Sequence, residues 1–154
     1  MQAYVTQYQV PYGELVEEDW TMKRIAVVGA GYWGRNLVRV YSELGGLTAV
    51  CDHSEATLNQ VAETYPGVDT AMALTDVLSR SDIDAVVVVS PAETHYATTR
   101  EALLAGKHVF SEKPMTLRNE EAEELIELAD SSGLVLMVGH LLQYHPVFVR
   151  LKDM

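Results

Sequence analysis

Three glycines within six residues separate an apolar run from an amphipathic segment in RIAVVGAGYWGRNLVRVY, residues 24–41. The β-branched apolar run predicts a buried strand, and the spacing of apolar residues after the glycines predicts a helix. Glycines at such a junction have two interpretations. They could let the backbone approach a phosphate group, or they could only turn the chain between the two elements.

Apolar runs rich in β-branched residues recur along the chain. They are residues 25–28, 47–51, 85–89, 109–110 and 134–138. Continuous apolar runs of this length are expected for strands that are buried on both faces of a sheet.

Amphipathic segments lie between these runs. One helix is predicted to be capped by Ser54 and to end at Pro66. Its apolar face contains Leu58, Val61, Ala62 and Tyr65. A second helix, over 120–129, has an apolar face and five glutamates elsewhere, which we interpret as a solvated surface. Strands that alternate with helices predict an α/β fold of the Rossmann type, a doubly wound, mostly parallel sheet with helices on both faces.

The glycines can now be interpreted by position. Gly29, Gly31 and Gly34 form the pattern G-x-G-x-x-G after a strand and before a helix, the context that a dinucleotide-binding loop requires. Gly29 would permit the tight turn, Gly31 would let the backbone approach a pyrophosphate, and Gly34 would let helix and strand pack closely. Asp52 follows the second strand about 20 residues past the loop, where an acid can accept hydrogen bonds from the adenosine ribose. We therefore favour a nucleotide site over a simple turn with a capping aspartate.

Asp52 also indicates which cofactor is preferred. A carboxylate that pairs with the two ribose hydroxyls would repel a 2'-phosphate, and the following His53 and Ser54 supply no arginine to bind one. The sequence predicts NAD rather than NADP.

Composition excludes several classes of partner. The 154-residue chain has a formal net charge of -11, which argues against nucleic acid or an anionic membrane as a partner. Residues 1–21 carry four acids and no Lys or Arg, and we expect them to form a flexible extension before a dinucleotide-binding domain at 22–154. Without a signal-like start, a long apolar run or a second cysteine to pair with Cys51, the chain is expected to be cytoplasmic.

Two later segments, SPAETHY at 90–96 and SEKPMTL at 111–117, each follow an expected strand. Together with the glycine loop and Asp52, they resemble the glucose-fructose oxidoreductase, inositol dehydrogenase and rhizopine-catabolism family (Gfo/Idh/MocA) from residue 22 to about residue 152. Within that family, GAGYWGRNLVR and VGHLLQYHPVFVRLK look most like the members that oxidise nucleotide-linked amino sugars at C3.

The resemblance implies hydride transfer between nicotinamide and a hydroxyl carbon of a sugar or sugar nucleotide. Such a transfer leaves a proton on the hydroxyl, and the family pattern gives the role of proton relay to Lys113. Glu112 would orient that lysine or face the cofactor, and His95 would lie near the nicotinamide end. Trp33 would either cover the pyrophosphate or pack the loop. The expected cofactor-binding residues are Gly29, Gly31, Tyr32, Trp33, Gly34, Asp52, Ser90, Pro91, His95, Glu112 and Lys113.

Residues after the last expected strand match the part of the family that faces cofactor and substrate. They are His140, Gln143 and His145. Gln143 stands where many relatives have Arg and His145 where many have Asn, so substrate contacts are open at these positions. His53 and His108 are interpreted as ordinary surface or strand-edge residues. No cluster has the spacing of metal ligands, and Cys51 is expected to be a buried apolar residue.

The family's enzymes continue into a C-terminal α+β domain that supplies most of the sugar pocket, and this chain ends at residue 154 without it. We expect a truncated protein in which residues 146–154 begin the helix that leads to that domain. Alone, it would bind dinucleotide but turn over sugar poorly, and its exposed apolar surface could drive formation of a homo-oligomer. The alternatives are a non-catalytic dinucleotide-binding module or a subunit completed by a partner chain. A methyltransferase would share the glycine loop but would not explain Glu112, Lys113 and Pro114.

Overall fold

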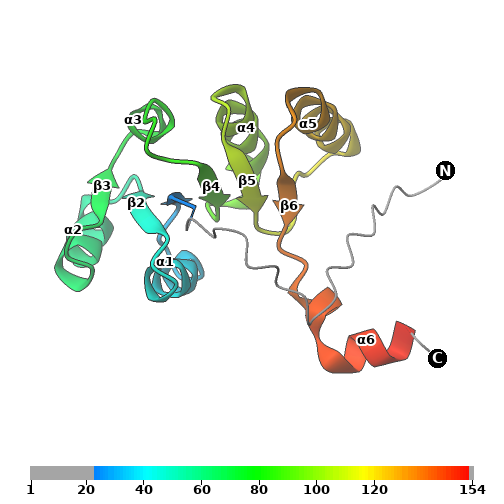
Figure 1. Ribbon diagram of the computed structural model, residues 1–154, viewed down its shortest axis with the longest axis horizontal. Coiled ribbons are helices and arrows are strands. Elements are labelled where there is room, and N and C mark those ends of the chain that lie inside the picture. Colours follow the sequence, from blue (N-terminus) through cyan, green and yellow to red (C-terminus); the bar gives the residue numbers. More distant parts are fainter. Residues whose placement is uncertain (1–22, 153–154) are drawn as a thin grey trace, which may run out of the picture.

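Six parallel strands form one sheet in the order β3-β2-β1-β4-β5-β6 (Figure 1). The structure is a computed structural model that describes residues 23–152, so the expected N-terminal extension lies outside the described residues. The strands are β1 (Ile25–Val28), β2 (Leu47–Cys51), β3 (Asp69–Ala71), β4 (Ala85–Val88), β5 (His108–Ser111) and β6 (Leu136–Val138). This order is the one found in dinucleotide-binding sheets.

Helices cover both faces of the sheet, as Figure 1 shows. The helices are α1 (Gly34–Glu43), α2 (Glu55–Thr64), α3 (Leu74–Leu78), α4 (Ala92–Leu104), α5 (Asn119–Ser132) and α6 (Pro146–Lys152), with a 3-10 turn, η1, at Leu141–Tyr144. Helices α1 and α2 pack on one face and α3, α4 and α5 on the other. The predicted doubly wound architecture is confirmed, and the sheet is wholly parallel.

The core consists of two apolar layers, because the central strands bury alternate residues on opposite faces. Val27, Val50 and Val87 point toward α1 and α2, whereas Val86 and Val88 point toward α3, α4 and α5. All five side chains are at most 2% exposed. Burial of a valine side chain contributes roughly 1.5 kcal/mol or more to folding, so these layers fix the positions of the strand ends.

Local signals set the helix ends. Ser54 caps α2 by accepting a hydrogen bond from the backbone N–H of Thr57 at 3.3 Å, as predicted. Helix α5 ends at Gly133, whose φ of 64° is a left-handed conformation that glycine adopts without strain. No helix among residues 23–152 is long and apolar enough to cross a membrane.

Besides the short η1 turn, three elements were not predicted from the sequence. Strand β3 has only three residues, two of them exposed and polar, so it leaves no apolar run. Helix α3 spans five residues, too few for a helical pattern to repeat. Helix α4 begins inside the segment that we interpreted as a turn, because Pro91 directly precedes its first residue.

Candidate functional site

The carboxyl ends of β1 and β4 lie side by side at the centre of the sheet. From β1 the chain passes to α1 on one face, and from β4 it passes to α4 on the other face. When the connections after two neighbouring strands go to opposite faces of the sheet, they leave a crevice beyond the carboxyl ends of those strands. Ligands bind in this crevice in open α/β sheets.

The glycine loop between β1 and α1 lies against the end of β4. Gly29 has a φ of 96°, and a Cβ atom there would lie 2.8 Å from the backbone nitrogen of Ser90. At Gly34 a Cβ atom would overlap the carbonyl oxygen of Gly29 and lie 3.2 Å from Val89 Cγ1. Both positions therefore require glycine for backbone packing.

Gly31 is different, because nothing lies within 4 Å of the Cβ position that it would have. The backbone N–H groups of four consecutive residues donate no hydrogen bond to any group within residues 23–152. They are those of Gly31, Tyr32, Trp33 and Gly34. Helix α1 also has no acid in its first turn. Open space at Gly31, together with free N–H groups at a helix N-terminus, fits the pyrophosphate of a dinucleotide.

Asp52 is buried at the end of β2 and holds the glycine loop in place. Its Oδ2 accepts a hydrogen bond from the backbone N–H of Ala30 at 2.8 Å, and its Oδ1 accepts one from Ser54 at 2.9 Å. The exposed ring of His53 lies 3.5 Å from Oδ1. Sequence reasoning anticipated a ribose contact for Asp52 but not this structural link to the loop.

A cavity of about 370 Å³ lies beside Asp52. Six of the expected cofactor residues line it: Gly29, Gly31, Tyr32, Asp52, Ser90 and Pro91. Its position next to the glycine loop and the acid after β2 fits the adenosine half of a dinucleotide.

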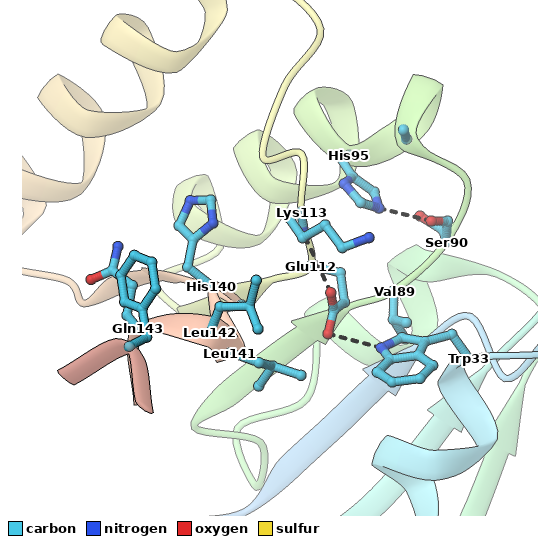
Figure 2. A pocket seen from close by; sticks show the side chains of 13 residues that line it. Trp33, Val89, Ser90, His95, Glu112, Lys113, His140, Leu141, Leu142 and Gln143 are labelled. Carbon is cyan, nitrogen blue, oxygen red and sulfur yellow. Dashed lines mark hydrogen bonds between the residues drawn. The ribbon is translucent and has the colours of Figure 1, made fainter. Parts of the chain in front are cut away.

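A larger cavity, of about 690 Å³, lies where the loops after β1, β4, β5 and β6 meet (Figure 2). It brings together seven of the expected site residues: Trp33, Ser90, His95, Glu112, Lys113, His140 and Gln143. His145 lines neither this cavity nor the smaller one. Its Nδ1 instead accepts a hydrogen bond from the backbone N–H of Val147 at 3.3 Å.

Glu112, directly after β5, is buried at the wall of the larger cavity. Its Oε1 accepts a hydrogen bond from the indole Nε1 of Trp33 at 3.0 Å, and its Oε2 accepts one from the backbone N–H of Lys113 at 3.2 Å. The side chain of Lys113 is exposed to the cavity, where an amine can reach a bound ligand.

His95, on α4, is 2% exposed. Its Nε2 lies 2.7 Å from the carbonyl oxygen of Ser90, and its Nδ1 lies 2.7 Å from the carbonyl oxygen of Pro114. The ring therefore joins the end of β4 to the turn that carries Lys113. It borders the larger cavity, but both of its nitrogens contact the protein.

Sequence reasoning missed several residues that line the larger cavity. They are Val89, Ala92, Gly139, Leu141, Leu142 and Phe148. Most are apolar residues without a chemical motif. A glycine directly after the last expected strand was a usable signal for Gly139, because the loops at strand ends form the site.

Neither a metal nor a reactive thiol is indicated by the described part of the chain. Residues 23–152 contain no group of three or more His, Cys, Asp or Glu side chains that could hold a metal ion. Burial raises the pKa of the Cys51 thiol to about 11, with a smaller contribution from Asp52, so the thiol is protonated at neutral pH.

Comparison with known proteins supports these observations. The Gfo/Idh/MocA family model, described as an oxidoreductase family with an NAD-binding Rossmann fold, matches residues 23–140. The UDP-N-acetylglucosamine 3-dehydrogenase of Acidithiobacillus ferrooxidans is 35% identical over 135 residues, which cover 84% of this chain and 41% of that relative. A solved structure of that enzyme is similar with a TM-score of 0.77, at 34% identity and coverage of 84% and 42%.

Two further solved structures contain cofactors. The WlbA dehydrogenase from Chromobacterium violaceum, in complex with NADH and UDP-GlcNAcA, has a TM-score of 0.79 at 30% identity, covering 85% of this chain and 40% of that one. A 3-ketoreductase from Actinomadura kijaniata, in complex with NADP and TDP-benzene, has a TM-score of 0.79 at 30% identity, covering 86% and 41%. The chain thus spans about two fifths of the length of these relatives.

Proposed function

This chain belongs to the Gfo/Idh/MocA oxidoreductase family and forms its NAD-binding Rossmann domain, and from that premise we propose that it serves a sugar or nucleotide-sugar dehydrogenase. The observation that carries the proposal is the glycine loop, which offers free N–H groups and open space at Gly31 beside the anchored Asp52. When bound, the cofactor supplies the hydride acceptor or donor at its nicotinamide ring.

We propose NAD as the preferred cofactor. Asp52 is a buried carboxylate beside the adenosine-sized cavity, and each of its oxygens has a lone pair beyond the one used by Ala30 or Ser54. A carboxylate there can accept ribose hydroxyls and repels a phosphate group. The relatives bind NADH in one case and NADP in another, so the test must be made on this chain.

Calorimetric titration of the chain with NADH and NADPH tests both cofactor binding and preference. We expect the chain to bind NADH at least tenfold more tightly than NADPH. We expect Asp52→Asn to reduce the ratio of the NADPH dissociation constant to the NADH dissociation constant. The asparagine side chain keeps one oxygen that can accept a hydrogen bond from the loop, whereas alanine would remove the hydrogen bonds to both Ala30 and Ser54. Because both cofactors need the same loop, damage to it cancels in the ratio. Failure of the chain to bind either cofactor would refute the proposed function.

We propose that Lys113 is the group that holds or relays the proton of the sugar hydroxyl. It borders the cavity that the nicotinamide end would enter, and its turn is fixed by Glu112 and His95. A lysine amine can exchange a proton with a hydroxyl that lies within hydrogen-bond reach, which suits a proton relay. Sugar nucleotides with an amino sugar are the first substrates to test, because they are the ligands named for the similar dehydrogenases.

The surface around the larger cavity suggests how the sugar site is completed. Large apolar side chains are exposed along η1 and α6 next to it: Leu141, Leu142, Tyr144, Val147, Phe148, Val149 and Leu151. We propose that polypeptide outside residues 23–152 covers this surface and closes the sugar site. A dinucleotide-binding module without catalysis is the alternative, and nucleotide-sugar-dependent formation of NADH distinguishes the two.

A further inference from the structure

We propose that Trp33 and Glu112 form a latch that sets the distance between the glycine loop and the turn carrying Lys113. This inference rests on the proposed function, because the spacing matters only if a dinucleotide lies across both segments. It assigns Trp33 and Glu112 as positioning residues rather than as groups that take part in the chemistry.

The latch is a single buried carboxylate with two donors from different segments. Glu112 is 6% exposed, and its two oxygens accept from the indole of Trp33 at 3.0 Å and from the backbone N–H of Lys113 at 3.2 Å. Figure 2 shows both hydrogen bonds at the wall of the larger cavity. Hydrogen bonds to an ionised acceptor are stronger than those between neutral groups.

The carboxylate is also confined sterically. A Cβ atom on Gly139 would lie 3.2 Å from Glu112 Cδ and Oε1 and 3.0 Å from Phe110 Cζ, tighter than ordinary van der Waals contact, so the glycine gives the carboxylate its space. The backbone beneath is fixed, because the N–H of Glu112 donates to Val88 at 2.8 Å and that of Gly139 donates to Ser111 at 2.9 Å. The backbone that carries Glu112 is therefore fixed, and the hydrogen bonds from Trp33 and Lys113 hold the carboxylate in place.

With this geometry, the latch sets the distance between the glycine loop and the turn that carries Lys113. The glycine loop holds the pyrophosphate in our proposal, and the nicotinamide is covalently tethered to it with a limited reach. Lys113 lies on another loop, and Glu112 joins that loop to Trp33. Misplacement of a reacting group by about 1 Å can cost about 100-fold in rate, so a link of this kind has a functional consequence.

Amide hydrogen exchange on the free protein tests the link directly. We expect Trp33→Phe, which removes the indole donor, to accelerate exchange of the Lys113 amide about tenfold, because the carboxylate is then free to turn away. Tyr96→Phe is the matched control, since it removes an aromatic donor to a glutamate, Tyr96 to Glu124 at 2.6 Å, outside the cavity. Unchanged exchange at Lys113 in Trp33→Phe would overturn the latch.

Ligand titrations test the consequence. In Trp33→Phe we expect NADH to bind about tenfold more weakly, whereas ADP-ribose, which lacks the nicotinamide, binds within about twofold of the wild type. The positioning role would be overturned if NADH and ADP-ribose lost the same affinity, or if neither lost affinity. Glu112→Gln is the second variant if Trp33→Phe does not fold, because its amide nitrogen cannot accept from Lys113, and the same split is expected. A wild-type chain that binds neither ligand refutes the proposed function and this role together, whereas wild-type binding without the split refutes this role alone.

Discussion

The second and third glycines of the loop before α1, Gly31 and Gly34, allow packing to be separated from ligand binding. At Gly34 an added Cβ atom would overlap the carbonyl oxygen of Gly29 and lie 2.9 Å from its carbonyl carbon. At Gly31 the same atom would meet nothing within 4 Å, and the backbone there does not have a positive φ. Alanine should therefore have opposite consequences at two positions only three residues apart.

The expected magnitude follows from the surroundings of Gly34. Overpacking against backbone atoms costs about 1–3 kcal/mol, and the clash with Gly29 is severe enough to place the cost near the upper limit. The higher helix preference of alanine offsets roughly 0.5–1 kcal/mol of this loss in the free energy of unfolding. The net loss of about 2 kcal/mol should lower the Tm by roughly 6–10 °C in a domain of this size.

Gly31→Ala should leave the Tm unchanged or slightly higher, because alanine restricts the unfolded chain without a clash in the folded one. Its methyl group would instead occupy the open space at Gly31 that we assign to the pyrophosphate, and NADH binding should weaken at least tenfold. Thermal unfolding followed by circular dichroism, together with NADH calorimetry, measures both effects. A Gly34→Ala variant as stable as the wild type, or a Gly31→Ala variant that loses as much stability, would refute this reasoning.

Three further predictions concern Lys113, Cys51 and the pair Arg24 and Asp84. In the sugar dehydrogenase that we propose, Lys113→Met should lower kcat about 100-fold because the proton relay is lost, and stopped-flow kinetics would contradict the proton role if kcat were unchanged. Because burial raises the pKa of Cys51 to about 11, iodoacetamide at pH 8 should modify the native thiol on the order of 100-fold more slowly than the unfolded one, as mass spectrometry can measure. The side chain and backbone N–H of Arg24 hold the pKa of Asp84 well below its ordinary value, so the pair stabilises the fold above about pH 4 and this contribution disappears as the pH falls through the lower folded value. Urea unfolding should accordingly show that the advantage of wild type over Arg24→Met is largest at pH 6 and becomes smaller as the pH is lowered from about 4 toward about 2, and a constant difference across this range would argue against the pairing.

The sequence predicted those elements whose burial is strong and regular. Strands β1 and β2 have the predicted bounds, because both are apolar runs between clear turns. The edge strand β3 could not be recognised, since an edge strand of three residues is held by pairing with β2 and not by its own apolar residues. The sequence pattern reveals a strand that buries its own apolar residues. It does not reveal a strand that forms only because a neighbouring strand pairs with it.

The same limit applies to the site. Motifs identified Asp52, Glu112 and Lys113 as a group of interest, but not the contacts that join them to the glycine loop. The indole of Trp33 reaches a carboxylate that lies far along the chain, and no spacing rule relates the two positions. Whether Trp33 would cover a phosphate or pack the loop could not be decided from the sequence, and the structure shows a hydrogen bond that neither alternative included.

The packing of Gly29 against Ser90 also determines when a binding site can exist during folding. Residues 23–71 already contain three strands and two helices, yet the wall that holds the glycine turn comes from β4 and the residue after it. A growing chain would therefore have no complete nucleotide site until β4 has paired with β1. From that point a dinucleotide that binds the folded sheet but not the unfolded chain would stabilise it by mass action, so the cofactor of our proposal would act as a late folding ligand of this domain.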